Sequence, residues 1–313
     1  MTLKTIMFGT VFFWQWEEDF IIWLQGIGGT GAFQKFLVAL NNFFSFLGEE
    51  YFAILVMGIV YWGIDKKKGE KLGLAVISSM VINTLIKNRF KRLRPWLSSD
   101  DIVLHREVTG YSFPSAHSSS ASSLYSTLMV EFREHKWVKI PAIILPVLIA
   151  LSRCYLGAHW PTDVLTGLLL GVVSCVVIEL LMPRIKNKYI LYLIFLIVGA
   201  TGFFYCTTED FFTNYGLLLG FSGAMLFDEK CVKFENTNKK LYMVLRTLFG
   251  GLVFVVTNLV LKTLIGSIFP EETFLYLLMR TVRYACVSFV TIGVSPFMFK
   301  PAEKKLDKIF KFN

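Results

Sequence analysis

The chain has 313 residues, of which 54% are hydrophobic and 18% charged, and its mean hydropathy is +0.56. A soluble domain of this size carries about a quarter charged residues, so the composition excludes an ordinary soluble protein. The net charge of +9 lies in short Lys and Arg clusters between apolar blocks. This pattern is typical of cytoplasmic loops that face anionic lipid, and we expect no nucleic-acid partner.

The N-terminal segment, residues 1–30, is predicted to lie at the membrane interface. Met1–Trp14 has one lysine and a short apolar run but no small-residue cleavage site, so we expect it to be retained. Trp14–Trp23 mixes tryptophans with carboxylates, which suits a helix lying in the interface plane.

Apolar blocks fill most of the remaining chain. A helix needs roughly 20 mainly apolar residues to cross a bilayer, or about 17 when its ends snorkel. The sequence therefore predicts an all-α fold, a polytopic membrane helix bundle without a soluble domain. The expected helices are 31–47, 50–64, 70–89, 115–132, 138–156, 160–182, 189–206, 211–228, 241–266 and 273–294.

The loops between these helices alternate in charge, and basic loops mark the cytoplasmic side. The basic ones are 65–71, 131–139, 183–188, 228–240 and the tail from Lys300, whereas 48–50, 207–210 and 267–272 are short and acidic or neutral. The alternation holds at every crossing from Gly48 to the C-terminus and predicts the orientation of the whole bundle.

Two segments, 87–114 and 152–163, carry cations on the extracytoplasmic side, where the rule expects few. We attribute the exception to a negatively charged substrate. Three stretches in these segments each begin or end a predicted helix at one membrane level, so their side chains can converge. They are Lys87–Pro95, Tyr111–Ser118 and Ser152–Asp163.

The residue types in these stretches suit a phosphoester. Phosphoryl transfer spreads negative charge over the equatorial oxygens, so fixed cations and oriented N–H groups are the main catalytic resource. Lys87, Arg94 and Arg153 supply positive charges, and the two guanidinium groups match phosphate oxygens bidentately. Ser115 follows Pro114 at the start of a helix, where unpaired N–H groups attract an anion, and its hydroxyl can add a donor.

Two histidines complete the predicted chemistry. His159 and Asp163 are four residues apart, and Pro161 suits the first position of a helix. Asp163 can hold one imidazole nitrogen as N–H and leave the other free to attack phosphorus. His117 can then protonate the leaving alkoxide. No carboxylate cluster suggests Mg²⁺, so we expect hydrolysis through a phosphohistidine with no metal and no cofactor.

These stretches resemble the three signature motifs of the type 2 phosphatidate phosphatase family, which is related to haloperoxidases. The family pattern is Lys-x6-Arg-Pro, then Pro-Ser-Gly-His, then Ser-Arg-x5-His-x3-Asp, and the first and third motifs match in full spacing. The second has Ala116 where glycine is commonest. Alanine keeps the backbone N–H, so activity should survive unless the position needs positive φ.

The resemblance assigns a role to each matching residue. It implies that the phosphate is bound at Lys87, Arg94, Ser115, Ala116 and Arg153. It further implies that His117 is the acid, His159 the nucleophile and Asp163 its partner.

A finer similarity concerns the sphingosine-1-phosphate phosphatase branch of the family. It rests on Phe46–Phe52, on Tyr111-x-x-Pro114, on Arg283-Tyr284 with Pro296, and on about four helices beyond the six-helix core. The implied organisation places the phosphatase core with its three motifs in 31–185. Residues 186–313 then hold the additional transmembrane helices and a basic cytoplasmic tail.

Several other polar residues have simpler interpretations. We expect Arg89, Lys91 and Arg92 to snorkel to lipid phosphates, and His105 and Arg106 to be exposed in their loop.

The serines at 118–120, 122 and 123 favour close helix packing. Lys262, Arg280 and Arg283 should pair within the bundle or line a cavity, Arg280 with Glu271 or Glu272.

The predicted function is an integral membrane phosphatase that acts on a lipid phosphomonoester or diphosphate at the extracytoplasmic or lumenal face. Its expected partners are a phosphorylated lipid and the bilayer. Two alternatives stay open: transfer of the phosphoryl group to another acceptor, and transport or scrambling of phosphorylated lipids without catalysis. Neither the lipid nor the oligomeric state follows from the sequence.

Overall fold

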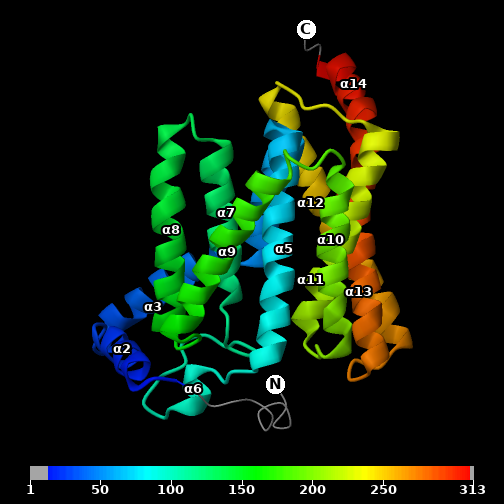
Figure 1. Cartoon of the computed structure of the whole chain (residues 1–313). Helices are drawn as coiled ribbons and strands as arrows, with labels where there is room; N and C mark the ends of the chain where they lie inside the picture. Colours follow the sequence, from blue (N-terminus) through cyan, green and yellow to red (C-terminus); the bar gives the residue numbers. More distant parts are fainter. Residues whose placement is uncertain (1–12, 311–313) are drawn as a thin grey trace.

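A computed structural model describes residues 13–310, and this part of the chain is a helical bundle without β-strands (Figure 1), as the sequence predicts. The predictions for residues 1–12 and 311–313 lie outside it. The helices are α2 (Gln15–Gly26), α3 (Ala32–Phe46), α4 (Glu50–Gly58) with the π-helix η1 (Ile59–Ile64), α5 (Lys66–Phe90), α6 (Pro95–Ser98), α7 (Ala116–Glu131), α8 (Lys136–Tyr155), α9 (Pro161–Leu181), α10 (Lys188–Ala200) with η2 (Thr201–Phe204), α11 (Glu209–Phe227) with η3 (Asp228–Val232), α12 (Lys240–Ile268), α13 (Phe274–Phe289) with η4 (Val290–Val294) and η5 (Ser295–Met298), and α14 (Phe299–Phe310).

Each predicted membrane helix has a counterpart in this series. Within the described residues, 5 helices are long and apolar enough to cross a membrane, or up to 6 if the bent pair of 32–46 and 50–64 counts as one span. Helix α7 has only 16 residues and α11 begins with Glu209 and Asp210, so neither is among these spans. Both bury polar and small residues against neighbouring helices.

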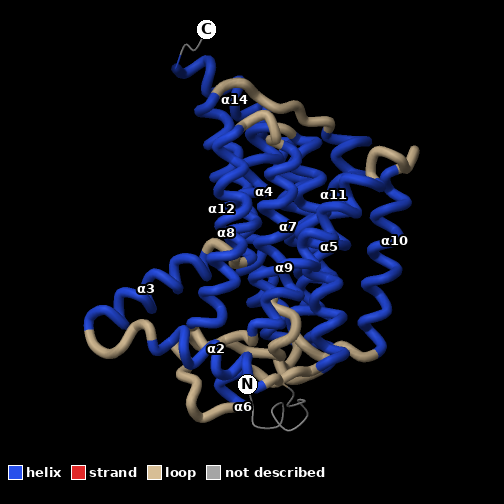
Figure 2. Tube along the Cα trace, turned by 60° about the vertical axis from the view of Figure 1, so that its left-hand side comes forward, coloured by secondary structure: helices blue, strands red, loops and turns tan. Residues whose placement is uncertain are grey.

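One predicted crossing needs correction: α3 does not cross the bundle by itself. In the last turn of α2, a short loop before α3 begins, the Gln25 side chain donates to the backbone carbonyls of Val103 and Tyr155 at 2.7 and 2.9 Å. Near its end, Ser45 accepts a hydrogen bond from Arg153 at 2.6 Å. Both ends of α3 therefore lie at the same end of the bundle, and Figure 2 shows it leaving the bundle sideways. The pattern misled because an apolar helix suits a crossing and an oblique position equally well.

Close backbone contact joins α7 to α9, as the serine-rich face of α7 predicts. A Cβ on Gly171 of α9 would lie 2.5 Å from the carbonyl oxygen of Ser119 and from the amide nitrogen of Ser123. Small residues allow such approach, and packing drives helix association where lipid offers no hydrophobic gain. This contact fixes the start of α9 beside the start of α7.

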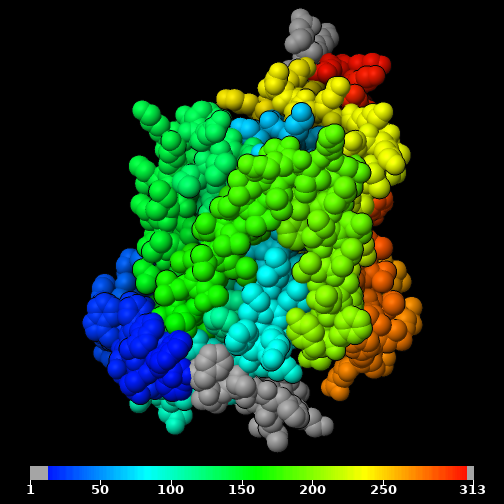
Figure 3. All heavy atoms as spheres, viewed as in Figure 1, coloured from blue at the N-terminus to red at the C-terminus, as the bar shows by residue number. Residues whose placement is uncertain are grey.

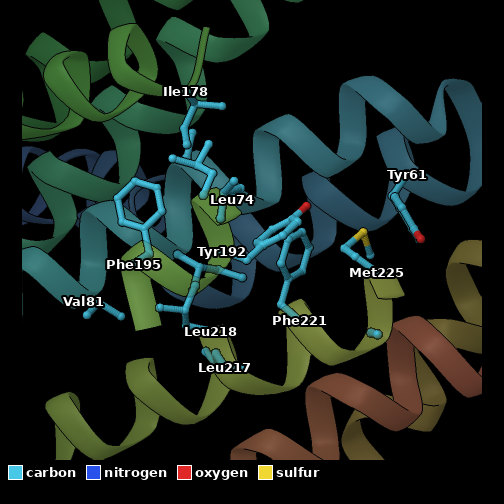
Figure 4. Packing of buried hydrophobic residues seen from close by; sticks show 14 of the residues in the cluster. Tyr61, Leu74, Val81, Ile178, Tyr192, Phe195, Leu217, Leu218, Phe221 and Met225 are labelled. Carbon is cyan, nitrogen blue, oxygen red and sulfur yellow. The ribbon is translucent and has the colours of Figure 1, made fainter. Parts of the chain in front are cut away.

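The later helices pack against the earlier ones through a shared apolar cluster around the central helix α5 (Figure 4). The cluster joins residues of α5 and α9 to residues of α10 and α11. Its members include Leu74, Val81, Ile178, Tyr192, Phe195, Leu217, Leu218 and Phe221. The phosphatase-like motifs and the C-terminal helices thus belong to one packed bundle.

Helix α2 lies against α8 and α9 at the end of the bundle opposite α14. In Figure 3, α2 and α3 form a bulge at one corner of the molecule. Trp14, Trp16 and Trp23 are exposed, whereas Glu17 and Ile21 are completely buried. A fully buried carboxylate on an otherwise peripheral helix requires a partner, and that partner belongs to the candidate site.

Candidate active site

The three motif-bearing stretches meet where α5 ends and α7 and α9 begin (Figure 1). They surround a cavity of about 350 Å³. Ser115 and Asp163 lie behind its wall and are fully buried. The other predicted site residues line the cavity: Lys87, Arg94, Ala116, His117, Arg153 and His159.

Arg94 is held by the loops on both sides of it. Its guanidinium donates to the backbone carbonyls of Gly110, Ala158 and Thr109 at 2.9, 2.8 and 2.5 Å. Its Nη1 also lies 3.3 Å from Nε2 of His159. These contacts fix a cation directly beside the imidazole.

Arg153 and Arg106 share one acceptor. Arg153 Nη1 donates to the Ser45 hydroxyl at 2.6 Å, and Arg106 Nη1 donates to the same oxygen at 3.1 Å. Arg106 also pairs with Glu49. The expectation that His105 and Arg106 are exposed is wrong: both are half-buried, His105 stacks on Tyr155, and Arg106 lines the cavity. The sequence could not show this because α3 and α4 supply the partners.

The N-terminus of α7 points into the cavity. Ser115 is its N-cap and accepts hydrogen bonds from the backbone N–H and hydroxyl of Ser118. Ala116 and His117 follow as the first helical residues, whose N–H groups have no partner within a helix. Ala116 is the first residue of α7, and its φ is not positive, since the only described non-glycine residues with positive φ are Lys91 and Lys233. Alanine thus fits the position where the family prefers glycine.

His159 lies between two groups of opposite charge. On one side is Arg94, and on the other Nδ1 lies 3.6 Å from Oδ2 of Asp163. The Ser112 hydroxyl donates to Asp163 and lies 3.5 Å from the same Nδ1. Asp163 also accepts from the backbone N–H of Trp160 at 2.8 Å. Ser112 lies within the predicted stretch Tyr111–Ser118, but no role was predicted for it because a single serine has no distinctive spacing.

Arg92 forms the support behind Asp163. Its Nη1 lies 2.7 Å from Asp163 Oδ1 and from the Thr162 hydroxyl, and its Nη2 lies 2.7 Å from Glu17. Glu17 in turn accepts from the N–H and hydroxyl of Thr162. The predicted snorkelling of Arg92 is therefore wrong, because it is only 1% exposed and points inward to two carboxylates.

Burial and neighbouring charges set the protonation states of the loop residues. Burial, followed by the positive charges of Arg94, Arg153 and Lys87, holds the pKa of His159 well below its ordinary value. The imidazole is therefore neutral at neutral pH, as a nucleophile requires. Burial also lowers the pKa of Arg94 to about 10, so this guanidinium stays charged.

The C-terminal helices form the opposite wall of the cavity. Asp210, Thr213 and Asn214 come from α11, and Arg280 and Tyr284 from α13. The carboxylate of Asp210 lies 3.8 Å from Nζ of the motif lysine. These helices thus contribute directly to the site.

The charged residues of α12 and α13 meet the prediction in part: Arg280 lines the cavity and Arg283 is buried, but the partner of Arg280 and the position of Lys262 differ. Arg280 pairs with Glu209 at 2.8 Å and donates to Thr213, not with Glu271 or Glu272, because α11 packs directly against α13. Lys262 is exposed on α12, where it neither lies in the bundle interior nor lines this cavity.

Among residues 13–310, no three His, Cys, Asp or Glu side chains gather into a possible metal site. Metal-independent catalysis stays a prediction, since the argument for it is the supply of cationic side chains.

Comparison with known proteins identifies the class. A family profile described as PAP2 superfamily matches residues 69–187, and a second, described as PAP2 superfamily phosphatase, transmembrane extension, matches residues 212–305. The chain belongs to the PAP2 superfamily.

Two similar proteins are named for different lipid phosphates. The chain is 34% identical over 143 residues to an undecaprenyl-diphosphatase of Sulfolobus acidocaldarius, which covers 43% of this chain and 67% of that protein. It is 30% identical over 142 residues to human sphingosine-1-phosphate phosphatase 2, over 43% of this chain and 35% of that protein. The predicted family resemblance is confirmed, and the relatives include the sphingosine-1-phosphate phosphatases.

Among solved structures, the chain is similar to Aquifex aeolicus LpxE. The TM-score is 0.44 at 23% identity, over 51% of this chain and 93% of that one.

Proposed function

We propose that this protein hydrolyses a lipid phosphomonoester or lipid diphosphate at the extracytoplasmic or lumenal face, through a phosphohistidine on His159 and without a metal ion. The observation that carries the proposal is the position of His159. Its Nε2 lies 3.3 Å from Arg94 inside a cavity that Lys87 and Arg153 also line, while its Nδ1 faces a carboxylate. Together, the cations can bind a phosphate group and the imidazole can attack it.

The phosphoryl group would enter with its oxygens facing Lys87, Arg94 and Arg153 and the first N–H groups of α7. Asp163, with Ser112, keeps the proton on Nδ1 of His159, so the lone pair of Nε2 faces phosphorus. As the P–N bond forms, the bond between phosphorus and the leaving oxygen breaks, and His117 donates a proton to that oxygen.

Water completes the cycle. His117 accepts a proton from water as its oxygen attacks phosphorus, the P–N bond breaks, and free phosphate leaves with His159 neutral again. The cations offset the charge on the equatorial oxygens in both steps, which is the contribution that a metal ion makes in other phosphotransfer sites.

Two observations support a lipid substrate on the outer side. The names of similar proteins include a lipid diphosphatase and a lipid monoester phosphatase, so both head groups are candidates. The cation-rich loops lie at the end of the bundle opposite the basic loops, and basic loops mark the cytoplasmic side, which supports a site on the extracytoplasmic or lumenal side.

The test uses the purified full chain in detergent and a panel of lipids: a sphingoid base phosphate, phosphatidate, lysophosphatidate, phosphatidylglycerophosphate and a polyprenyl diphosphate. We expect free phosphate in stoichiometric amounts with at least one lipid, inhibition by vanadate, and little effect of EDTA. Lipid consumption without free phosphate would favour phosphotransfer instead. Lipid movement in vesicles that persists in His159→Ala, with no hydrolysis by wild type, would favour transport.

A further inference from the structure

A second cavity lies beside the catalytic one, between the motif-bearing helices and the C-terminal helices. Its walls come from α4, η1, α5, α11 and η4, with one residue each from α7, α12 and α13, and they are mostly apolar. It is narrow, with a volume of about 70 Å³ against about 350 Å³ for the catalytic cavity. No residue of the catalytic motifs lines it.

The two cavities adjoin. Glu50, Met80 and Asn214 belong to both walls. From this junction the apolar cavity follows α4 down to Trp62 of η1, a distance of about 18 Å at 1.5 Å per helical residue. A molecule whose phosphate occupies the catalytic cavity could therefore extend directly into the apolar one.

We propose that the apolar cavity binds one unbranched hydrocarbon chain of the lipid phosphate, held between the phosphatase core and the transmembrane extension. The inference rests on the proposed function, since it extends the same substrate from the same site. The walls of the cavity suit a hydrocarbon chain, because an apolar cavity does not retain water well. Met57 and Met80 are unbranched and adaptable, so they can move aside for a chain in this narrow space.

The cavity would act on selectivity more than on affinity. A lipid chain leaves surroundings as apolar as the cavity itself, so its transfer brings little hydrophobic gain. The walls instead restrict which hydrocarbon chains fit. A protein side chain that fills the cavity excludes a long hydrocarbon chain but not a short one. The length of the chain should therefore decide how well a phosphate ester is hydrolysed.

The test compares butyl phosphate with hexadecyl phosphate in the same mixed micelles. Ala53 faces the cavity from α4, and Leu55 lies two residues away on the exposed face of the same helix. In Ala53→Phe we expect the ratio of kcat/KM for hexadecyl to butyl phosphate to fall about tenfold or more relative to wild type. In Leu55→Phe the ratio should not change. Butyl phosphate hydrolysis by Ala53→Phe also shows that the variant is folded.

A second measurement avoids substitutions. Hexadecyl phosphate with a photoreactive group at the chain end should label wild-type protein at the deep end of the cavity, near Tyr61, Trp62 or Phe221. Labelling confined to the lipid-facing surface, or equal ratios in the two Phe variants, would overturn the chain site while phosphate release continues. If wild type releases phosphate from neither ester but does so from a lipid of the panel above, the site for an unbranched chain is overturned. If it releases phosphate from no ester and no panel lipid, the proposed function itself fails.

Discussion

Nη1 of Arg92 lies 2.7 Å from Oδ1 of Asp163, so the carboxylate that faces His159 is itself held by a buried cation. The other oxygen of Asp163 accepts from Ser112 and Trp160. Glu17 completes the set at the far side of Arg92, at 2.7 Å. Two negative charges and one positive charge are thus buried together, and each depends on its neighbours.

Glu17→Gln removes one charge of this network and leaves Arg92 with a single carboxylate. Taking one partner from a buried ion pair costs about 3 kcal/mol or more, so we expect a lower unfolding midpoint and a lower kcat. Asp19→Asn is the matched control, because Asp19 is exposed on the same helix. Thermal unfolding and phosphate release measure both effects. Equal behaviour of the two variants would contradict a supporting role for Glu17.

Ser112→Ala removes the hydroxyl that donates to Asp163 beside His159. A hydrogen bond to a charged group is worth about 1.5–3 kcal/mol, so kcat should fall about 10- to 100-fold while KM changes little. Ser123→Ala serves as control, because its buried hydroxyl has no hydrogen-bond partner among the described residues. A change in KM alone would instead indicate that Ser112 contributes to substrate binding.

His159→Ala should abolish turnover. Loss of a covalent nucleophile lowers kcat by about a thousandfold or more, and no other described histidine lies beside both Arg94 and Asp163. His135→Ala should keep full activity, since His135 is exposed in the loop between α7 and α8. A phosphohistidine hydrolyses in acid, so the intermediate should be trapped at alkaline pH. A near-wild-type rate would mean that the nucleophile is another residue.

The pH dependence follows from the lowered pKa of His159. As the proposed nucleophile, His159 is active in its neutral form, and burial beside Arg94 keeps the imidazole neutral as pH falls past the ordinary histidine value of 6.5. The acid limb of kcat/KM should therefore lie below pH 6.5. Since the unfolded chain binds this proton more tightly, the same residue lowers stability as pH falls below that value. An acid limb above it would contradict the assignment.

Ala116→Gly restores the commonest residue of the second motif. Because Ala116 is helical and keeps its N–H, we expect kcat/KM within about threefold of wild type, and a slight loss of stability from the poorer helix propensity of glycine. A gain of about tenfold would show that the alanine restricts the phosphate site.

The sequence alone determined the fold class and most of the candidate site. Long apolar segments leave a helical membrane bundle as the stable arrangement, and alternating loop charge predicts its orientation. Lys87 and Arg94 are close in sequence near the end of α5, and His159 and Asp163 near the start of α9, so each pair stays close in space. Local spacing was therefore enough to find them.

Only the tertiary structure decided which distant residues support these groups. Glu17 and Arg92 are 75 positions apart, and Arg106 and Glu49 are 57 apart. The sequence likewise did not predict the position of α3, or the cavity wall that Asp210 and the last helices form. A charged residue near a membrane surface can snorkel outward or be buried with a partner, and both fit the same sequence pattern. Packing of the whole bundle makes that choice, because it determines which opposite charge lies within reach.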